Sequence, residues 1–290
     1  MTTQRFQFPD HAGSPQNDGM MLAVIGYGEA GSAFAIAGAW GNHARGWDLK
    51  DDRRAAMVVD GLPVSRSAQE ALAHARLVLS LVTATSAYEA ARDYAPLLAP
   101  GAIWCDMNSV APETKRAAAA MIEAAGAHYV DAAVLAPVHP ARLSVPLLLS
   151  GEASAQAELL LRQAGFETIS IAGNDIGRAS AIKLLRSVMV KGLEALTAEM
   201  LLGANALGVT DAVLASLDAS ERRDSWFDRA AYNIERMATH GVRRAAEMEE
   251  AVSMLRDIGV EPIMTTGTVR RQQMQAGKPI ASPNEGEHGS

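Results

Sequence analysis

Three glycines with the spacing Gly26-x-Gly28-x-x-Gly31 follow a short apolar run and precede an alanine-rich helical pattern that ends near Trp40. Gly26 permits a tight turn, Gly28 lets the backbone approach a pyrophosphate, and Gly31 lets the helix lie close to the strand. The first turn of that helix offers unpaired N–H groups and a partial positive charge to phosphates. The pattern predicts a dinucleotide-binding turn. Its residues are Gly26, Tyr27, Gly28, Glu29, Ala30 and Gly31.

A carboxylate follows the second expected strand. Asp48 lies roughly 20 residues after the first glycine, where an acidic side chain commonly binds the adenosine ribose hydroxyls. This position favours NAD as the cofactor. Three nearby cations, Lys50, Arg53 and Arg54, could instead bind the 2′-phosphate of NADP, or could simply be solvated in a loop. The prediction is NAD, and NADP stays open.

Lysine occurs at only five positions, and two of them, Lys183 and Lys191, lie in one apolar helical segment. Ser187 follows Lys183 by one turn, so the two side chains share a face of that helix. The Leu, Ile, Val and Met residues around them predict that much of the helix is buried. Burial lowers the pKa of an amine from about 10.4 toward neutrality, which suits a general base that accepts the proton of an alcohol as hydride leaves. The alternative is a lysine with a purely structural role.

Short apolar runs alternate with helical segments over the first part of the chain, which predicts a parallel sheet covered by helices on both faces. The expected strands are 22–25, 44–49, 77–82, 102–106, 128–134 and 147–150, with 166–171 as a candidate edge strand. Helical periodicity dominates afterwards. Long helices are expected at about 178–206 and 225–258, the second interrupted near Gly241. The fold class is therefore an α/β N-terminal domain with a Rossmann-type doubly wound parallel sheet, followed by an all-α C-terminal domain.

These patterns divide the chain into four parts. We expect a dinucleotide-binding domain at 20–173 and a helical substrate and dimerisation domain at 174–274. The segments 1–19 and 275–290 are polar and rich in Gly, Pro, Ser or Glu, so they are expected to be flexible tails.

Composition narrows the class of protein. A formal charge of −7 argues against nucleic-acid binding, which needs a basic surface. No apolar run reaches the roughly 18–20 residues of a membrane span, and the N-terminus lacks the basic-then-apolar order of a signal peptide. Cys105 is the single cysteine and is expected to be a buried, inert thiol. One cysteine cannot form a disulfide within the chain, which suits a reducing cytoplasm. His128, His139 and His240 have no metal-ligand spacing, so no metal is predicted.

Four ordered segments resemble the β-hydroxyacid dehydrogenases related to 6-phosphogluconate and 3-hydroxyisobutyrate dehydrogenase. They are the glycine turn, Asp106-x-Asn108-Ser109-x-x-Pro112, Asp131-Ala-Ala-Val134-Leu135-Ala136-Pro137, and Gly173-x-x-x-Gly177 followed by Lys183. The resemblance covers roughly residues 20–271. It extends to a bacterial branch whose phosphogluconate-dehydrogenase-like C-terminal domain has no assigned function.

The resemblance implies roles for individual residues. Lys183 would be the acid/base. Arg186 and Ser187 would replace the two asparagines beside it, with Ser187 as the second catalytic residue. The nicotinamide would be bordered by Val82, Thr83, Ala84, Asn108 and Ser109. The substrate contacts would come from Asn108, Val134, Leu135, Ala136, Lys191, His240 and Arg244. A homodimer is implied as well, because in this family the helical domain of one subunit commonly completes the active site of the other.

Two departures from the family bear on the substrate. The segment Leu135-Ala136-Pro137 replaces a Ser-Gly-Gly that offers N–H groups to a substrate carboxylate. The final Lys-Asp-Leu motif is absent, and His240-Gly-Val-Arg243-Arg244 stands in its neighbourhood. Arginine forks suit carboxylates, so these residues could form a relocated anion site. They could equally be a solvated helix face with an Arg243–Glu247 pair.

The sequence thus predicts an NAD(P)-dependent oxidoreductase. It would transfer a hydride between nicotinamide and a β-hydroxy acid or a related small hydroxylated substrate, with Lys183 as general acid/base. One alternative is an NADPH-dependent enzyme similar to imine reductases, and another is a non-catalytic sensor of nicotinamide nucleotides. Substrate identity, reaction direction, NAD against NADP, and the number of subunits beyond a dimer stay open. A bulkier, less acidic substrate than 3-hydroxyisobutyrate would suit the apolar loop.

Overall fold

The computed structural model describes residues 22–220 and 225–278. The chain forms two compact units, Met1–Arg186 and Ser187–Ser290, and helix α7 (Arg178–Ala206) contributes to both. The predicted tail 1–19 and most of the predicted tail 275–290 lie outside the described residues. No helix in the described part is long and apolar enough to cross a membrane.

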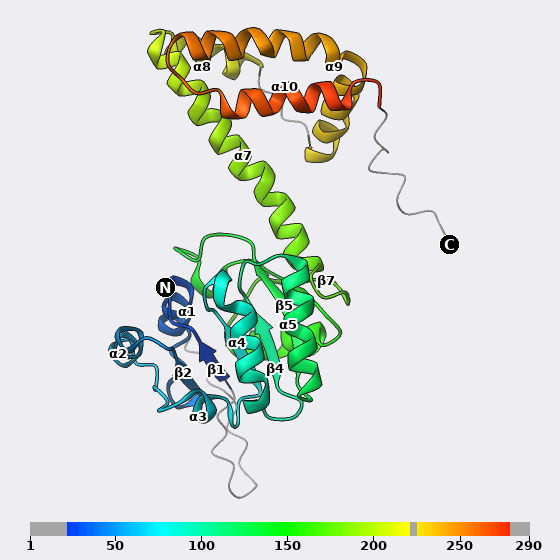
Figure 1. Ribbon diagram of the computed structural model, residues 1–290. Coiled ribbons are helices and arrows are strands. Elements are labelled where there is room, and N and C mark those ends of the chain that lie inside the picture. The colour runs from blue at the N-terminus through cyan, green and yellow to red at the C-terminus, as the bar shows by residue number, and fades with distance from the viewer. Residues whose placement is uncertain (1–21, 221–224, 279–290) are drawn as a thin grey trace, which may run out of the picture. The chain divides into compact units, whose positions relative to one another are not determined.

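A seven-stranded sheet forms the centre of the first unit (Figure 1). Its strands, in spatial order, are β2 (Ala44–Trp47), β1 (Leu22–Ile25), β3 (Leu77–Ser80), β4 (Ile103–Asp106), β5 (His128–Val134), β6 (Leu147–Ser150) and β7 (Ile169–Gly173). All neighbours are parallel except β5 and β6. The predicted Rossmann-type α/β class is confirmed.

The expectation of an entirely parallel sheet is wrong for β6, which pairs antiparallel with β5. A parallel pair needs a crossover of a dozen or more residues, usually containing an α-helix. The link between β5 and β6 is described throughout, and its helical content is the single short turn Arg142–Ser144. Without a crossover helix the chain reverses, so β6 runs against β5.

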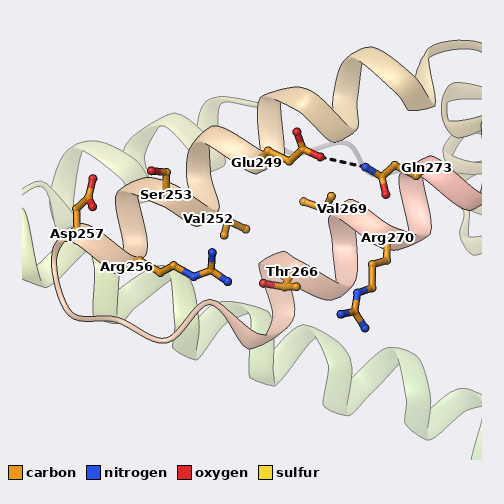
Figure 2. A pocket seen from close by; sticks show the side chains of 9 residues that line it. All are labelled: Glu249, Val252, Ser253, Arg256, Asp257, Thr266, Val269, Arg270 and Gln273. Atoms are coloured by element: carbon orange, nitrogen blue, oxygen red, sulfur yellow. Dashed lines mark hydrogen bonds between the residues drawn. The ribbon is translucent and has the colours of Figure 1, made fainter.

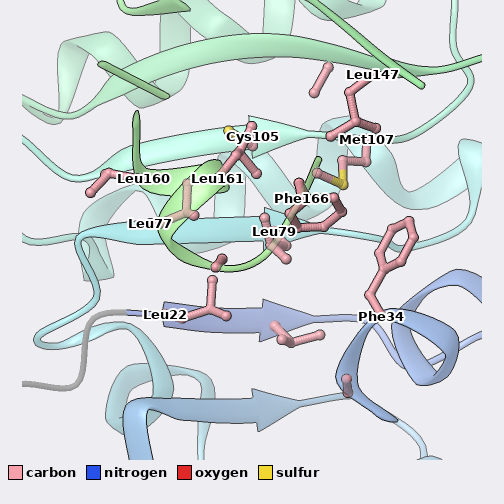
Figure 3. Close-up of a cluster of buried hydrophobic side chains, with 14 of the residues drawn as sticks. Leu22, Phe34, Leu77, Leu79, Cys105, Met107, Leu147, Leu160, Leu161 and Phe166 are labelled. Carbon is pink, nitrogen blue, oxygen red and sulfur yellow. The ribbon is translucent and has the colours of Figure 1, made fainter. Parts of the chain in front are cut away.

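Both faces of the sheet are buried because the side chains of each strand alternate between two hydrophobic cores. In β1, Leu22 and Val24 join the first core, and Ala23 and Ile25 the second. The first core, drawn in Figure 3, involves α1 (Glu29–Gly38), α2 (Asp51–Val59) and α6 (Ser154–Gln163). The second involves α3 (Ala68–Leu72), α4 (Ala87–Tyr94) and α5 (Pro112–Ala124). This two-sided burial explains why the strands read as continuous apolar runs.

The order of the strands creates a switch point beside β1. Strand β2 lies on one side of β1 and β3 on the other, so the connections leave the centre of the sheet in opposite directions. In open α/β sheets, ligands bind outside the carboxyl ends of the strands at such a point. The turns that follow β1, β3 and β4 all lie at this edge of the sheet.

Helices are the only regular secondary structure in the described residues of the second unit. It contains the C-terminal part of α7, α8 (Thr210–Ser220), α9 (Trp226–Asp257) and α10 (Ile263–Gln275). Helices α9 and α10 pack side by side (Figure 1). The sequence prediction of an all-α C-terminal region is confirmed.

Helix α9 is continuous through Gly241, so the predicted interruption there is wrong. A Cβ at Gly241 would lie 2.5 Å from the carbonyl oxygen of Gln272 and 3.0 Å from the Cβ of Ala276. The glycine therefore allows α10 to approach the backbone of α9 closely. Sequence alone does not separate this use of glycine from a helix break, because the neighbour is supplied by a later helix.

The prediction that much of α7 is buried is wrong within one chain. Its apolar side chains are largely exposed, with Leu185 and Val188 each at 72% and Leu202 at 60%. Such a long exposed apolar surface on a helix is unusual for a monomer in water. Helix α7 therefore has the apolar composition of a buried helix, but many of its apolar side chains are exposed in the single chain.

A buried carboxylate joins α7 to α10 within the second unit. Glu199 is 7% exposed. Its oxygens accept hydrogen bonds from the N–H of Met264 at 2.7 Å, the N–H of Thr265 at 2.8 Å and the hydroxyl of Thr265 at 2.5 Å. Burial alone would raise the pKa of Glu199, but these hydrogen bonds outweigh it and lower the pKa. The carboxylate satisfies N–H groups that the start of a helix leaves without intrahelical partners.

We expect Glu199→Gln to lower the free energy of unfolding by about 1–3 kcal/mol, because an amide NH₂ would face a buried N–H donor. The depressed pKa also sets a pH dependence. The carboxylate contributes its full stabilisation above its unfolded pKa of about 4.3, and this is lost as pH falls through the lower folded value. Urea denaturation of both proteins across this acidic range measures both effects. The exposed control Glu247→Gln should cost under about 1 kcal/mol. Equal stability of Glu199→Gln and the parent near neutral pH would contradict the assignment.

Candidate active site

The glycine turn after β1 has the close contacts that its spacing predicts. Gly26 has φ +94°, and a Cβ there would lie 2.5 Å from the carbonyl oxygen of Leu81, just past β3. A Cβ at Gly31 would lie 2.5 Å from the oxygen of Gly26. Gly28 differs, since a Cβ there would meet nothing within 4 Å. Gly26 and Gly31 are therefore fixed by packing inside the protein, whereas Gly28 faces open space that a ligand can use.

Helix α1 begins directly behind this open space. Its N-cap is Gly28, which has no side chain to cap the helix, and Glu29 and Ala30 follow in the first turn. The uncapped end presents backbone N–H groups and the positive end of the helix dipole. Tyr27 ties the turn to the rest of the domain: its backbone N–H donates to Asp48, and its buried side chain donates its hydroxyl to Asp60 at 2.9 Å. Burial, followed by this hydrogen bond, raises the pKa of Tyr27.

Asp48 lies beside the glycine turn. One carboxylate oxygen accepts the N–H of Tyr27 at 2.7 Å, and the other accepts the N–H of Lys50 at 2.9 Å. The neighbouring Arg54 donates to the carbonyl oxygen of Asp48 at 2.5 Å, lies over the ring of Trp47 at 4.9 Å and pairs with Asp51. Asp48 is therefore held at the end of β2 with acceptor capacity left for hydroxyl groups, while Arg54 is tied to the protein.

The predicted nicotinamide edge combines the turns after β3 and β4. Ser80 and Asp106 are opposite residues on these neighbouring strands, so Val82, Thr83 and Ala84 lie beside the turn of Asn108 and Ser109. The hydroxyl of Thr83 bonds with those of Thr85 and Ser86. These short polar side chains line an edge that is partly open to solvent.

Asn108 is held tightly below this edge. Its side-chain N–H₂ donates to Asp106 at 2.7 Å and to the hydroxyl of Ser80 at 3.1 Å, and its backbone N–H donates to Asp106 at 2.9 Å. The amide oxygen of Asn108 is buried and accepts no hydrogen bond from the described residues. A buried acceptor without a partner is costly, so this oxygen is available to a donor on a bound molecule or to a water.

Lys183 meets the same edge from helix α7. Its Nζ donates to the hydroxyl of Ser109 at 2.5 Å, although 74 residues separate the two in sequence. Lys183 is half-buried. The structure thus brings the proposed acid/base to the predicted cofactor edge, where a neutral amine could accept a proton and an ammonium could return one.

The predicted substrate loop follows β5. Val134, Leu135 and Ala136 are half-buried there. The N–H of Leu135 donates to the carbonyl oxygen of Pro146 at 2.9 Å, and its own carbonyl accepts from Arg186 at 3.1 Å. Because this N–H is already used, it is not offered to a substrate carboxylate. The loop presents apolar side chains instead.

The remaining predicted site residues, the catalytic Ser187 among them, lie farther along the chain. Ser187 and Lys191 follow Lys183 on α7, and the first is half-buried while the second is exposed. His240 is exposed and Arg244 half-buried on α9 in the second unit. Arg243 pairs with Glu247, as the structural alternative for this stretch expected. The role of Ser187 in catalysis and those of Lys191, His240 and Arg244 in substrate binding stay predictions.

A groove of about 470 Å³ lies between α9 and α10 (Figure 2). Its lining includes Arg256, Asp257 and Arg270, and a hydrogen bond of 3.0 Å joins Glu249 to Gln273. None of the residues predicted to bind cofactor or substrate lines it. The charges around it are mixed, so the groove does not favour a ligand of one sign.

Sequence reasoning missed a buried charged cluster directly beneath the site. Lys115, on α5, has 0% side-chain exposure and contacts the carboxylates of Asp106 at 3.1 Å and Asp131 at 3.3 Å. Tyr129 donates to Asp106 at 2.5 Å, and Ser180 to Asp131 at 2.6 Å. The available signal was the scarcity of lysine together with two aspartates in neighbouring apolar strands.

Cys105 is buried, and burial raises the pKa of its thiol to about 12. The expected burial of this thiol is confirmed, and a thiol with such a pKa is a poor nucleophile near neutral pH. Within residues 22–220 and 225–278, no cluster of three His, Cys, Asp or Glu side chains could hold a metal ion.

Comparison with known proteins supports a nucleotide site. Residues 21–171, just over half of the chain, match the NAD binding domain of 6-phosphogluconate dehydrogenase. Residues 204–274 match a domain of unknown function, DUF1932. The first unit therefore carries an NAD-binding domain.

Solved structures extend the likeness over most of the chain. A conserved hypothetical protein from Sinorhizobium meliloti 1021 is 32% identical, with a TM-score of 0.60 over 88% of both chains. MTH1747, a protein of unknown function described as structurally similar to 3-hydroxyacid dehydrogenases, is 27% identical, with a TM-score of 0.58 over 88% of this chain and 96% of its own. The imine reductase of Myxococcus stipitatus, solved with NADP⁺, shares the fold at 17% identity, with a TM-score of 0.70 over 88% of this chain and 93% of its own. A variant of it was solved with NAD⁺.

Gly28→Ala should weaken NADH binding at least about tenfold, because the added methyl group would occupy the space through which backbone approaches the pyrophosphate. The free energy of unfolding should change by less than about 1 kcal/mol, since the methyl group meets no protein atom within 4 Å. Fluorescence titration and urea denaturation measure the two quantities. Gly31→Ala is the comparison: it should weaken NADH binding and, unlike Gly28→Ala, should also lower the free energy of unfolding. Unchanged NADH affinity in Gly28→Ala would refute this use of the turn.

Proposed function

We propose that this chain is an NAD(P)-dependent oxidoreductase acting on a β-hydroxy acid or a related small hydroxylated compound. The chain belongs to the family defined by the NAD-binding domain of 6-phosphogluconate dehydrogenase. The observation that carries the proposal is the contact of 2.5 Å between Lys183 and Ser109. It joins a titratable amine to the turn after β4, at the carboxyl edge where nucleotides bind in this fold.

A bound nicotinamide would accept or supply the hydride. The chain itself would supply the proton chemistry. As the alcohol is oxidised, the neutral amine of Lys183 takes the hydroxyl proton, and in the reverse direction its ammonium returns that proton to the forming alkoxide. Ser109 holds the amine at the edge through its hydroxyl, and the adjacent residue Asn108 has a buried amide oxygen that accepts no hydrogen bond from the described residues.

The loop after β5 bears on the class of substrate. Leu135 and Ala136 are apolar, and the N–H of Leu135 is already bonded to Pro146. A small carboxylate would find no preformed cradle there, so a substrate with an apolar group on this side fits better. The proposed preference is NAD, because the carboxylate of Asp48 can accept ribose hydroxyls and would repel a 2′-phosphate.

A second candidate is the reduction of a C=N bond, supported by the shared fold of the imine reductases. In that reaction Lys183 in its ammonium form would protonate or orient the nitrogen. Two parallel screens separate the candidates: hydroxy acids and polyol acids with NAD⁺ or NADP⁺, and cyclic imines with NADH or NADPH. Turnover of imines without oxidation of any hydroxy acid would favour the second. Cofactor affinity without turnover in either screen would indicate a sensor of nicotinamide nucleotides.

We expect Lys183→Met to lower turnover by roughly 10²- to 10⁴-fold, the usual contribution of a positioned acid/base. The dissociation constant of NADH should stay unchanged, because the pyrophosphate and adenosine contacts lie at the glycine turn. Steady-state kinetics and fluorescence titration measure these values. Lys278→Met, an exposed lysine in the second unit, is the control and should behave as the parent. Full activity in Lys183→Met would eliminate the assignment.

We also propose that the enzyme is a homodimer in which α7 is covered by the partner. Val188→Glu should then convert the dimer to a monomer, because a charge would be buried in an apolar contact. Val59→Glu is matched to it, since Val59 is 85% exposed on α2 and Val188 is 72% exposed on α7. Sedimentation velocity should find a dimer for the parent and for Val59→Glu. A monomeric parent at micromolar concentration would refute the proposal.

A further inference from the structure

We propose that Lys115 is a positioning residue whose buried ammonium holds together the two halves of the candidate active site. One half is the turn of Asn108 and Ser109, and the other is the first turn of α7, which carries Lys183. The inference rests on the proposed function for the role of Lys183, but its geometric basis is independent of the reaction.

The first half is held through Asp106. Lys115 Nζ donates to the carbonyl oxygen of Asp106 at 2.6 Å and lies 3.1 Å from its Oδ1. The same Oδ1 accepts the backbone N–H of Asn108 at 2.9 Å and its side-chain N–H₂ at 2.7 Å. Tyr129 donates to the other oxygen, Oδ2, at 2.5 Å. The carboxylate therefore fixes the turn whose next residue is Ser109.

The second half is held through Asp131. Lys115 Nζ lies 3.3 Å from its Oδ1, which also accepts the hydroxyl of Ser180 at 2.6 Å. Its Oδ2 accepts the backbone N–H of Ser180 at 2.8 Å, while Ala179 donates its N–H to the hydroxyl of Ser150 at 3.0 Å. The sheet thus satisfies N–H groups of the first turn of α7, where a negative charge also complements the helix dipole. Lys183 lies one turn farther along.

A positive charge is needed to bring these halves together. Asp106 and Asp131 are directly opposite on β4 and β5, and their side chains are 1% and 0% exposed. Two like charges in such a position repel strongly where water cannot screen them. Lys115 is the cation that contacts both carboxylates, so the spacing between the two anchors depends on its ammonium. Ser109 is held by the first anchor and Lys183 by the second, so the distance between Lys183 and Ser109 depends on that spacing too.

The test measures the amine of Lys183 without substrate or cofactor. Acetic anhydride labels Lys183 and the exposed Lys50, and mass spectrometry gives their labelling ratio as a function of pH. Ser180→Ala removes one donor to Asp131 and leaves every charge in place. Tyr129→Phe does the same at Asp106. Ser65→Ala is the control, because this buried hydroxyl has no hydrogen-bond partner among the described residues. Lys115→Met removes the ammonium that contacts both Asp106 and Asp131, and so tests its role directly.

Ser180→Ala and Tyr129→Phe should each change the labelling ratio by about threefold to tenfold, the effect of one hydrogen bond of ordinary net strength. The ratio should rise as Lys183 is released from Ser109, and its pH profile should shift. Folding is checked by thermal melting, and labelling is done well below the melting range. Ser65→Ala should keep the parent ratio. If Lys115→Met folds, its labelling ratio should be higher than that of Ser180→Ala and that of Tyr129→Phe.

Parent-like ratios in folded Ser180→Ala and Tyr129→Phe would overturn the proposal. NADH affinity should be unchanged in both variants, which separates positioning from loss of the nucleotide site. With a turned-over substrate, the same variants should lower kcat more than they raise KM. The reaction itself is tested separately by Lys183→Met. If that variant keeps full turnover, the catalytic role of Lys183 is refuted, whereas the labelling ratios still test whether Lys115 positions Lys183.

Discussion

Two aspartates placed side by side in the interior, Asp106 and Asp131, set the strongest constraint on this molecule. Two ionised carboxylates buried side by side are stabilised by a counter-charge and by donors for their remaining lone pairs. Lys115 supplies the charge, and Asn108, Tyr129 and Ser180 supply the donors. The cluster links β4, β5, α5 and α7. The elements that carry the candidate chemistry therefore share one electrostatic support.

The hydrophobic cores decide where that support can act. Because both faces of the sheet are covered by helices, functional groups are confined to the ends of the strands. At the carboxyl edge, glycines bring the backbone of one turn against the next, as Gly26 does against Leu81. A rigid two-sided core thus leaves one edge for the nucleotide, and α7 reaches this edge with Lys183.

The same physical solution recurs in the second unit. Asp131 accepts the backbone N–H of Ser180 at the start of α7, and Glu199 accepts those of Met264 and Thr265 at the start of α10. In each case a buried carboxylate replaces the usual capping side chain of a helix, and it comes from a distant part of the sequence. The starts of α7 and α10 are therefore anchored by tertiary contacts, which fix the direction of each helix as well as its first turn.

Local patterns in the sequence determined the strands β1, β5 and β6 to the residue, the extent of α7 and the dinucleotide turn. These follow from side-chain periodicity and from backbone freedom, which act over a few residues. Tertiary structure alone decided the direction of β6, the unbroken course of α9 through Gly241, and the contact of Lys183 with Ser109. It also placed Lys115 between its two aspartates. Those features depend on partners far away in the chain, and a glycine or a lysine looks the same in sequence whether a neighbour will pack against it or not.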